Sequence, residues 1–152
     1  MIQKHHAHAD IAQVMDYYDS VGRPGMWPDL NEFDPMSADI PRDVVDRMVL
    51  IEVTRRPWKF ELRHAGAFIE ETAGRRLKGR EFGERLRGEE RLQFDRNLID
   101  LVSKGRPSWR QGRSYLRKDI RNWALERVML PLSESGDRVD LLLSVSKFHN
   151  LG

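Results

Sequence analysis

The sequence has 152 residues, 39% hydrophobic and 33% charged, which fits one folded domain with one core and excludes global disorder. Its 26 Lys and Arg against 24 Asp and Glu leave a formal charge of +2, which supports nucleic-acid binding only weakly. The absence of Cys excludes disulfides, thiolate metal sites and cysteine nucleophiles.

The N-terminal region, residues 1–42, predicts one helix followed by an extended arm. Between residues 10 and 20, apolar residues repeat at helical spacing. They are Ile11, Val14, Met15 and Tyr18. We predict that they form the seam of a homodimer, although the same stripe could pack on the chain's own sheet. The arm, 21–42, is rich in Pro and Gly, which exclude long regular structure. We find neither a signal peptide nor a membrane span and expect a cytoplasmic protein.

Two short segments then predict an antiparallel hairpin. Residues 49–53 form a β-branched run, and residues 58–64 alternate apolar with charged side chains. Short helices are expected around 68–72 and over 79–86, because glycines bound both segments. The clearest helix follows over 89–104, where apolar residues recur every three or four positions.

The last third of the chain predicts three strands, over 108–118, 122–133 and 139–148, with gaps of hairpin length. The complete order is two strands, short helices, a long helix and three strands. This order predicts an α+β fold in which an antiparallel sheet carries helices on one face. We assign residues 43–152 to this domain.

Three short motifs in the predicted domain resemble those of a known family. Residues 60–66, Phe-Glu-Leu-Arg-His-Ala-Gly, are similar to an aromatic strand that ends in Arg-x-x-Gly, and 71–80 to a Gly-rich connector. Residues 130–132, Leu-Pro-Leu, resemble a later strand before its hairpin. The family is that of PAS domains found as small stand-alone bacterial proteins. The resemblance covers about 14–148 and implies a five-stranded sheet, able to enclose a small molecule, in a sensory module.

The resemblance also implies cofactors that the residues can test. Flavin and photoactive-yellow-protein-type sensors of this superfamily need a Cys, and the chain has none. Haem-binding members use a His on the long helix, and 89–104 contains none. We therefore expect neither haem nor flavin, and leave open an unidentified small molecule. His5, His6 and His8 are interpreted as a solvated tail rather than a metal site.

The candidate ligand pocket follows from strand alternation and from the apolar helix faces. His64 shares the predicted inward face of its strand with Phe60, so its imidazole could read a ligand or be a satisfied core histidine. The aromatic residues of the last strands could line the cavity or simply pack in the sheet. The candidate pocket residues are Phe60, His64, Ile69, Leu98, Tyr115, Trp123 and Met129.

The predicted function is to bind a small ligand or a protein partner and to relay the change to a separate signalling protein or a second copy. We predict no enzyme, because no nucleophile, base and orienting group stand at recognisable spacing. The alternative is a nucleic-acid-binding module that uses a basic strip interleaved with Trp109, Tyr115 and Trp123, although a solvated face or an anchor for an acidic partner is the favoured interpretation of the strip. The strip comprises Lys104, Arg106, Arg110, Arg113, Arg117, Lys118, Arg121 and Arg127.

Overall fold

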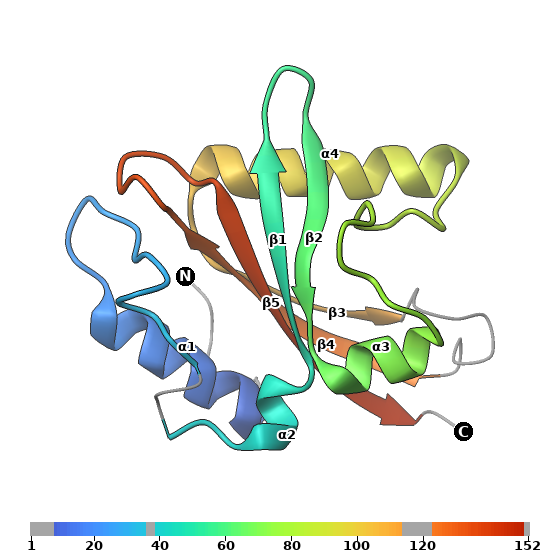
Figure 1. Ribbon diagram of the computed structural model, residues 1–152, viewed down its shortest axis with the longest axis horizontal. Coiled ribbons are helices and arrows are strands. Elements are labelled where there is room, and N and C mark those ends of the chain that lie inside the picture. Colours follow the sequence, from blue (N-terminus) through green and yellow to red (C-terminus); the bar gives the residue numbers. More distant parts are fainter. Residues whose placement is uncertain (1–7, 36–38, 114–122, 151–152) are drawn as a thin grey trace.

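The computed structural model describes residues 8–35, 39–113 and 123–150 (Figure 1). Its elements are α1 (Ala9–Val21), α2 (Arg42–Val45), β1 (Met48–Thr54), β2 (Lys59–Ala65), α3 (Ala67–Ala73), α4 (Gly88–Lys104), β3 (Ser108–Arg113), β4 (Trp123–Leu132) and β5 (Leu141–Asn150). These bounds closely match the predicted first helix, first hairpin and long helix, whereas α2 was not predicted. The predicted end of β3 lies outside the described residues.

The five strands form one sheet in the order β2-β1-β5-β4-β3, and every neighbouring pair is antiparallel. The sheet confirms the predicted α+β class. Its centre joins the first strand to the last, because Ile51 of β1 pairs with Leu142 of β5. The predicted hairpins, β1 with β2 and β4 with both β3 and β5, are its other pairs.

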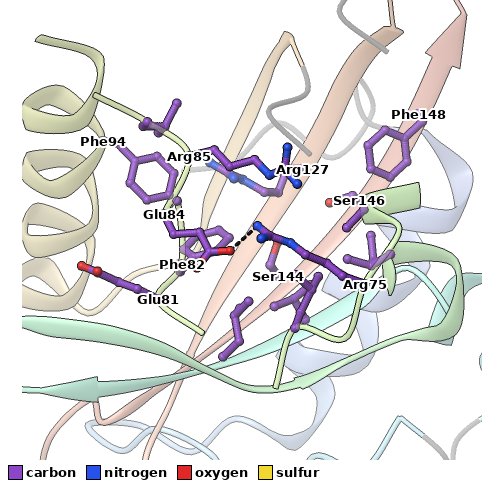
Figure 2. A pocket seen from close by; sticks show the side chains of 17 residues that line it. Arg75, Glu81, Phe82, Glu84, Arg85, Phe94, Arg127, Ser144, Ser146 and Phe148 are labelled. Atoms are coloured by element: carbon purple, nitrogen blue, oxygen red, sulfur yellow. Dashed lines mark hydrogen bonds and ion pairs between the residues drawn. The ribbon is translucent and has the colours of Figure 1, made fainter. Parts of the chain in front are cut away.

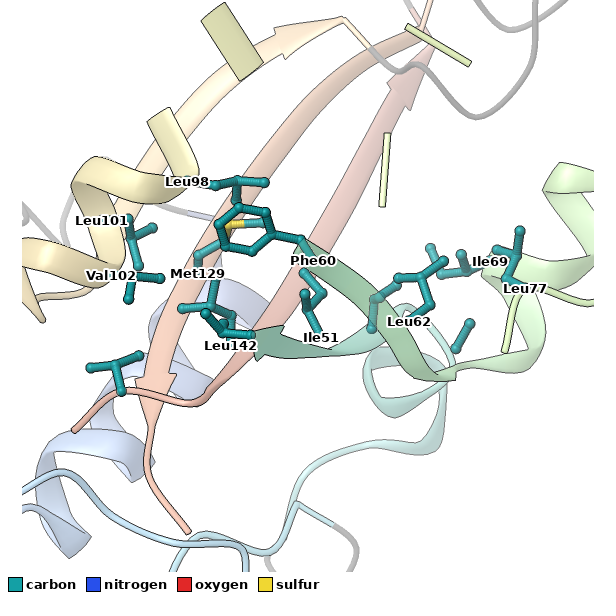
Figure 3. Packing of buried hydrophobic residues seen from close by; sticks show 14 of the residues in the cluster. Ile51, Phe60, Leu62, Ile69, Leu77, Leu98, Leu101, Val102, Met129 and Leu142 are labelled. Atoms are coloured by element: carbon teal, nitrogen blue, oxygen red, sulfur yellow. The ribbon is translucent and has the colours of Figure 1, made fainter. Parts of the chain in front are cut away.

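The sheet is covered on both faces. Side chains of α3 and α4 pack with Ile51, Phe60 and Leu142 in one apolar cluster (Figure 3). Leu141 and Leu143 of β5 belong to a second cluster with α1, because alternate residues of a strand point to opposite faces. The predicted helical face is therefore joined by an N-terminal helix on the opposite face, and Figure 1 shows α1 and α4 well apart.

The apolar stripe of α1 packs on the chain's own sheet. Ile11, Val14, Met15 and Tyr18 are all less than a tenth exposed and pack with side chains of β4 and β5. The Tyr18 hydroxyl donates a hydrogen bond to the carbonyl oxygen of Pro131 at 2.7 Å. The prediction that this stripe forms a homodimer seam is therefore wrong, because the sheet already covers its four side chains.

The arm between α1 and α2 contains no long regular element in its described part, as predicted. It contacts both faces of the molecule. Phe33 is fully buried and stacks on Tyr17 of α1 with ring centroids 4.7 Å apart. Trp27 donates its indole N–H to the carbonyl oxygen of Gly105, at the end of α4, at 2.8 Å. The division into 1–42 and 43–152 stays a prediction.

The segment 79–86 is not the predicted short helix. It belongs to an irregular stretch between α3 and α4, residues 75–87, which we call the connector. The backbone N–H groups of Gly79 and Phe82 donate to carbonyls of β2 at 2.7 and 2.8 Å, and Leu62 of β2 donates back to Arg80 at 2.8 Å. These bonds pair with the outer edge of β2, so the backbone of the connector bonds to the sheet as well as making turns of its own.

Candidate ligand-binding site

A cavity of about 110 Å³ lies on the α3 and α4 side of the sheet, behind the connector (Figure 2). Its lining is mostly apolar, and three aromatic rings contribute: Phe82 of the connector, Phe94 of α4 and Phe148 of β5. Ile69 of α3 and Leu62 of β2 add aliphatic surface. An apolar hollow with a few polar groups is the usual form of a small-molecule site.

The connector is fixed against α4 by close packing at Gly83. The residue has a φ of +76°, and a Cβ built there would lie 2.5 Å from the ring of Phe94. Arg91 of α4 donates to the carbonyl oxygen of Gly83 at 2.9 Å, and the rings of Phe82 and Phe94 lie 5.0 Å apart. The sequence therefore needs glycine here both for the left-handed backbone and for the approach of the ring.

Arg75 carries an unsatisfied donor beside the cavity. Its Nη2 donates to the carboxylate of Glu84 (Figure 2). The same carboxylate also accepts from Arg80 at 3.3 Å. Its Nε atom is buried and has no hydrogen-bond partner among the described residues. A buried donor left unpaired costs about 1–3 kcal/mol. Arg75 is one of the residues that line the cavity, so this unpaired donor belongs to a side chain of its wall.

The opposite wall comes from β5 and β4. Ser144 and Ser146 are at least nine-tenths buried and line the cavity, whereas the alternate residues Leu143 and Val145 pack toward α1. The guanidinium group of Arg127 lies 5.9 Å from the centroid of the Phe82 ring. Hydroxyl and guanidinium groups therefore stand opposite the apolar side of the connector.

Most of the predicted pocket residues in the described part of the chain pack near the cavity without lining it. Ile69 lines the cavity, and Phe60 lies in the apolar cluster behind it (Figure 3). Leu98 and Met129 border a second cavity of about 30 Å³, which shares Phe94 and Arg127 with the first. Their role in ligand binding stays a prediction. Tyr115 lies outside the described residues, and of Trp123 only the backbone, on β4, is described.

His64 does not face the core, so its predicted inward orientation is wrong. The pairing of β1 with β2 matches Leu50 with His64 but Ile51 with Leu62, which leaves Arg63 as an extra residue in β2. Such a bulge reverses the alternation of the strand. Leu62 and Ala65 are buried as a result, and His64 is exposed.

Sequence reasoning missed the polar residues that do line the cavity, above all Arg75, Glu84, Ser144 and Ser146. For Ser144 and Ser146, the sequence did contain a usable pattern. They interrupt the apolar run 141–148 at a spacing of two, which places both hydroxyls on one face of a strand. Arg75 and Glu84 gave no comparable signal, because an irregular segment has no period.

The basic strip is divided between two sites. Lys104, Arg106 and Arg110 line an open groove of about 530 Å³ between α1, the end of α4 and β3, but Asp19 and Asp100 line it too. Lys104 pairs with Asp100 at 3.1 Å. Arg127 turns instead to the cavity. Arg117, Lys118 and Arg121 lie outside the described residues, as does the side chain of Arg113. The described part of the strip therefore offers no single basic face for a nucleic acid.

His8 is part of the N-terminal cap of α1. Its Nδ1 accepts a hydrogen bond from the backbone N–H of Asp10 at 3.1 Å, while His5 and His6 precede the first described residue. Within 8–35, 39–113 and 123–150, no three His, Asp or Glu side chains come together as a metal site would require. In the same ranges, none of the helices combines the length and apolar character needed to cross a bilayer.

Comparison with solved structures finds the same fold in LOV proteins. The LOV protein of Rhodobacter sphaeroides superposes with a TM-score of 0.51 and 21% sequence identity, over 70% of this chain and 64% of that one. A point variant of RsLOV gives a TM-score of 0.53 and 20% identity over the same shares. The chain has a PAS fold. It spans slightly less than two thirds of the length of these LOV proteins. No family model matches the chain. A search of curated proteins also finds no match.

The expectation that flavin is excluded is wrong. The two solved structures named above are LOV proteins, and LOV proteins bind flavin. The absence of Cys excludes a covalent bond between a cysteine and a flavin. It does not exclude non-covalent flavin binding. Pockets for ligands of drug size typically measure roughly 300–1,000 Å³, so a cavity of about 110 Å³ has to widen before it holds a flavin ring system.

Proposed function

We propose that the chain is a PAS-type sensory module that binds a small molecule in this cavity and relays binding through its sheet. The observation that carries the proposal is the nature of the outer wall. The connector closes an apolar hollow. Edge hydrogen bonds to β2 and the bond from Arg91 to Gly83 join it to the rest of the domain, and the Arg75–Glu84 pair links its start to its middle. A wall of this kind can adjust to an occupant without unfolding the core.

The relay follows from the two faces of β5. Ser144 and Ser146 line the cavity, and Leu143 and Val145 of the same strand pack on the α1 side. A ligand that binds one arrangement of the connector and β5 more tightly than another raises the population of that arrangement. The shift would reach α1 through the strand, and from there a separate signalling protein or a second copy of the chain. The proposed activity is binding rather than catalysis.

The proposal is tested by filling the cavity. Ser144→Leu places an apolar group where the cavity now lies, and Ser103→Leu, on an exposed position of α4, is the matched control. The probes are toluene, as a single apolar ring, and FMN. Binding to the full chain is followed by NMR titration of backbone amides, and native mass spectrometry of freshly purified protein checks for a retained molecule.

We expect saturable shifts with toluene at the connector and β5, weakened at least roughly tenfold by Ser144→Leu, since a filled cavity loses the contacts that a ring would make. Ser103→Leu should behave as the unchanged chain. FMN binding that Ser144→Leu abolishes would support the same site in a widened form. Absence of saturable binding by both probes, together with no retained molecule, would overturn the proposal.

A further inference from the structure

The polar groups of the cavity select one chemical class of ligand, provided that the proposed binding function holds. Arg75 is the decisive residue. Its guanidinium group has two adjacent donors, and Glu84 accepts from Nη2 while the buried Nε remains without a partner. A carboxylate that approaches this edge can accept from both donors at once, which is the strong geometry for an arginine.

The charges around the cavity favour an anion. Arg75, Arg85 and Arg127 line it, against Glu81 and Glu84, so three cations face two anions. The carboxylate of Glu81 is half exposed and is held by Arg91 of α4. Glu84 is the acidic group that competes directly for Arg75, and it keeps a second partner, Arg80, when Arg75 is released.

The size of the cavity limits the rest of the ligand. An engineered apolar cavity of about 150 Å³, lined by Leu, Ile and Phe, holds one benzene molecule. This cavity is somewhat smaller, about 110 Å³, and is likewise lined by aliphatic side chains and by Phe82, Phe94 and Phe148. One ring or a short branched chain is therefore the upper limit for the apolar part of a ligand whose polar end reaches Arg75.

We propose that the cavity binds a small single-ring carboxylate and that Glu84 is its built-in competitor for Arg75. The carboxylate of the ligand takes Nε and Nη2 of Arg75, and the ring lies among the phenylalanines. Glu84 then remains on Arg80. Occupation of the site therefore breaks the pair that ties the start of the connector to its middle. This deepens the proposed function by coupling the ligand's charge to the connector.

The test compares benzoate with benzamide, which has nearly the same shape and no charge. Dissociation constants are measured by isothermal titration calorimetry on the full chain and on variants of known thermal stability. We expect benzoate to bind roughly tenfold more tightly than benzamide, because hydrogen bonds to a charged acceptor are about twice as strong. Arg75→Gln should abolish this preference. Arg75→Lys, which keeps the charge but lacks Nε, should retain only part of it.

Glu84→Gln keeps the shape of the competitor and removes its charge. It should tighten benzoate roughly tenfold and leave benzamide unchanged, because a neutral amide binds a guanidinium group less strongly. Glu71→Gln, an exposed position on α3 that does not line the cavity, is the matched control and should change neither constant.

The outcomes separate this inference from the proposed function. Equal affinity for benzoate and benzamide would overturn the carboxylate assignment while leaving a binding cavity in place. Glu84→Gln tightening both ligands alike would show that Glu84 restrains the connector without competing, which also contradicts the proposal. Failure of benzoate, benzamide and toluene together would remove the binding function itself.

Discussion

The indole N–H of Trp27 donates to the carbonyl oxygen of Gly105 at 2.8 Å, which places a side chain of the arm over the last turn of α4. Gly105 ends α4 with a φ of +65°, and a Cβ there would lie 2.6 Å from the indole ring. The arm and the long helix are therefore fitted to each other.

We predict that Gly105→Ala destabilises the chain more than Gly74→Ala does. Both glycines end helices with positive φ, but a Cβ at Gly74 meets nothing within 4 Å. Gly74→Ala should cost about 1 kcal/mol of unfolding free energy for its backbone alone, and Gly105→Ala about 1–3 kcal/mol more for overlap with Trp27. Urea denaturation measures both. Equal losses would mean that the indole moves aside at no cost.

At the connector, Gly83→Ala should lower stability more than Gly79→Ala. The φ values are similar, +76° and +85°, yet only the first position has a ring within 4 Å, that of Phe94. The additional loss should be roughly 1–3 kcal/mol. Faster hydrogen exchange of connector amides in the Gly83 variant would check that the wall itself has loosened. Unchanged exchange would argue against tight packing at this point.

For α1, Val14→Asp is expected to cost roughly 3 kcal/mol or more, because the carboxylate would be buried without a partner against the sheet. Gln13→Asp, at the exposed neighbouring position, should cost less than about 1 kcal/mol. Denaturation curves give the stabilities and light scattering gives the mass. A halved mass with stability intact would restore the homodimer seam.

The contribution of Asp10 should depend on pH. Burial alone would raise its pKa, but the hydrogen bond from Arg47 and the charges of Lys147 and His8 lower it below 3.8. The stabilisation is then complete above the unfolded value, near pH 4, and is lost as the pH falls through the lower folded value. Asp10→Asn should be less stable than the unchanged chain by about 1 kcal/mol at pH 6. Urea titrations should show this gap shrinking below pH 4, and a gap constant down to pH 3 would contradict it.

His64→Ala should change stability by less than about 0.5 kcal/mol, since the side chain is exposed. Leu62→Ala, two positions earlier, should cost about 2–5 kcal/mol, because it empties a core position. Thermal unfolding in parallel tests both. A large loss at His64 would mean that β2 has no bulge and that the imidazole faces inward.

Local periodicity predicted most of the regular elements, although not the four-residue α2. The stripe of α1 and the long apolar face of α4 repeat at helical spacing, and residues 58–64 alternate as a strand does. The hairpin pairs then followed from element order and hairpin lengths, whereas the pairing of β1 with β5 was not predicted. The face covered by α1 could not be derived in this way, because either face of the sheet offers apolar residues, such as Val128 and Met129 on β4.

The candidate site was less predictable for two physical reasons. The connector is held by hydrogen bonds to β2, for example from Phe82 to Phe60, and a partner so distant in the sequence leaves no periodic trace. One inserted residue in β2 also reversed the face of His64, although every other sign of a strand was present. The closure of the cavity by the connector and the register of β2 against β1 both depend on tertiary contacts.

The pairing of β1 with β5 has a consequence for how the chain is made. Met48 lies opposite Val145, so the middle of the sheet cannot assemble on the ribosome until the last strand has been synthesised. The first helix waits as well, since its stripe docks on β4 and β5. Topologies dominated by such distant pairings fold slowly for their size, and the nascent chain exposes the apolar side of its first hairpin throughout that delay.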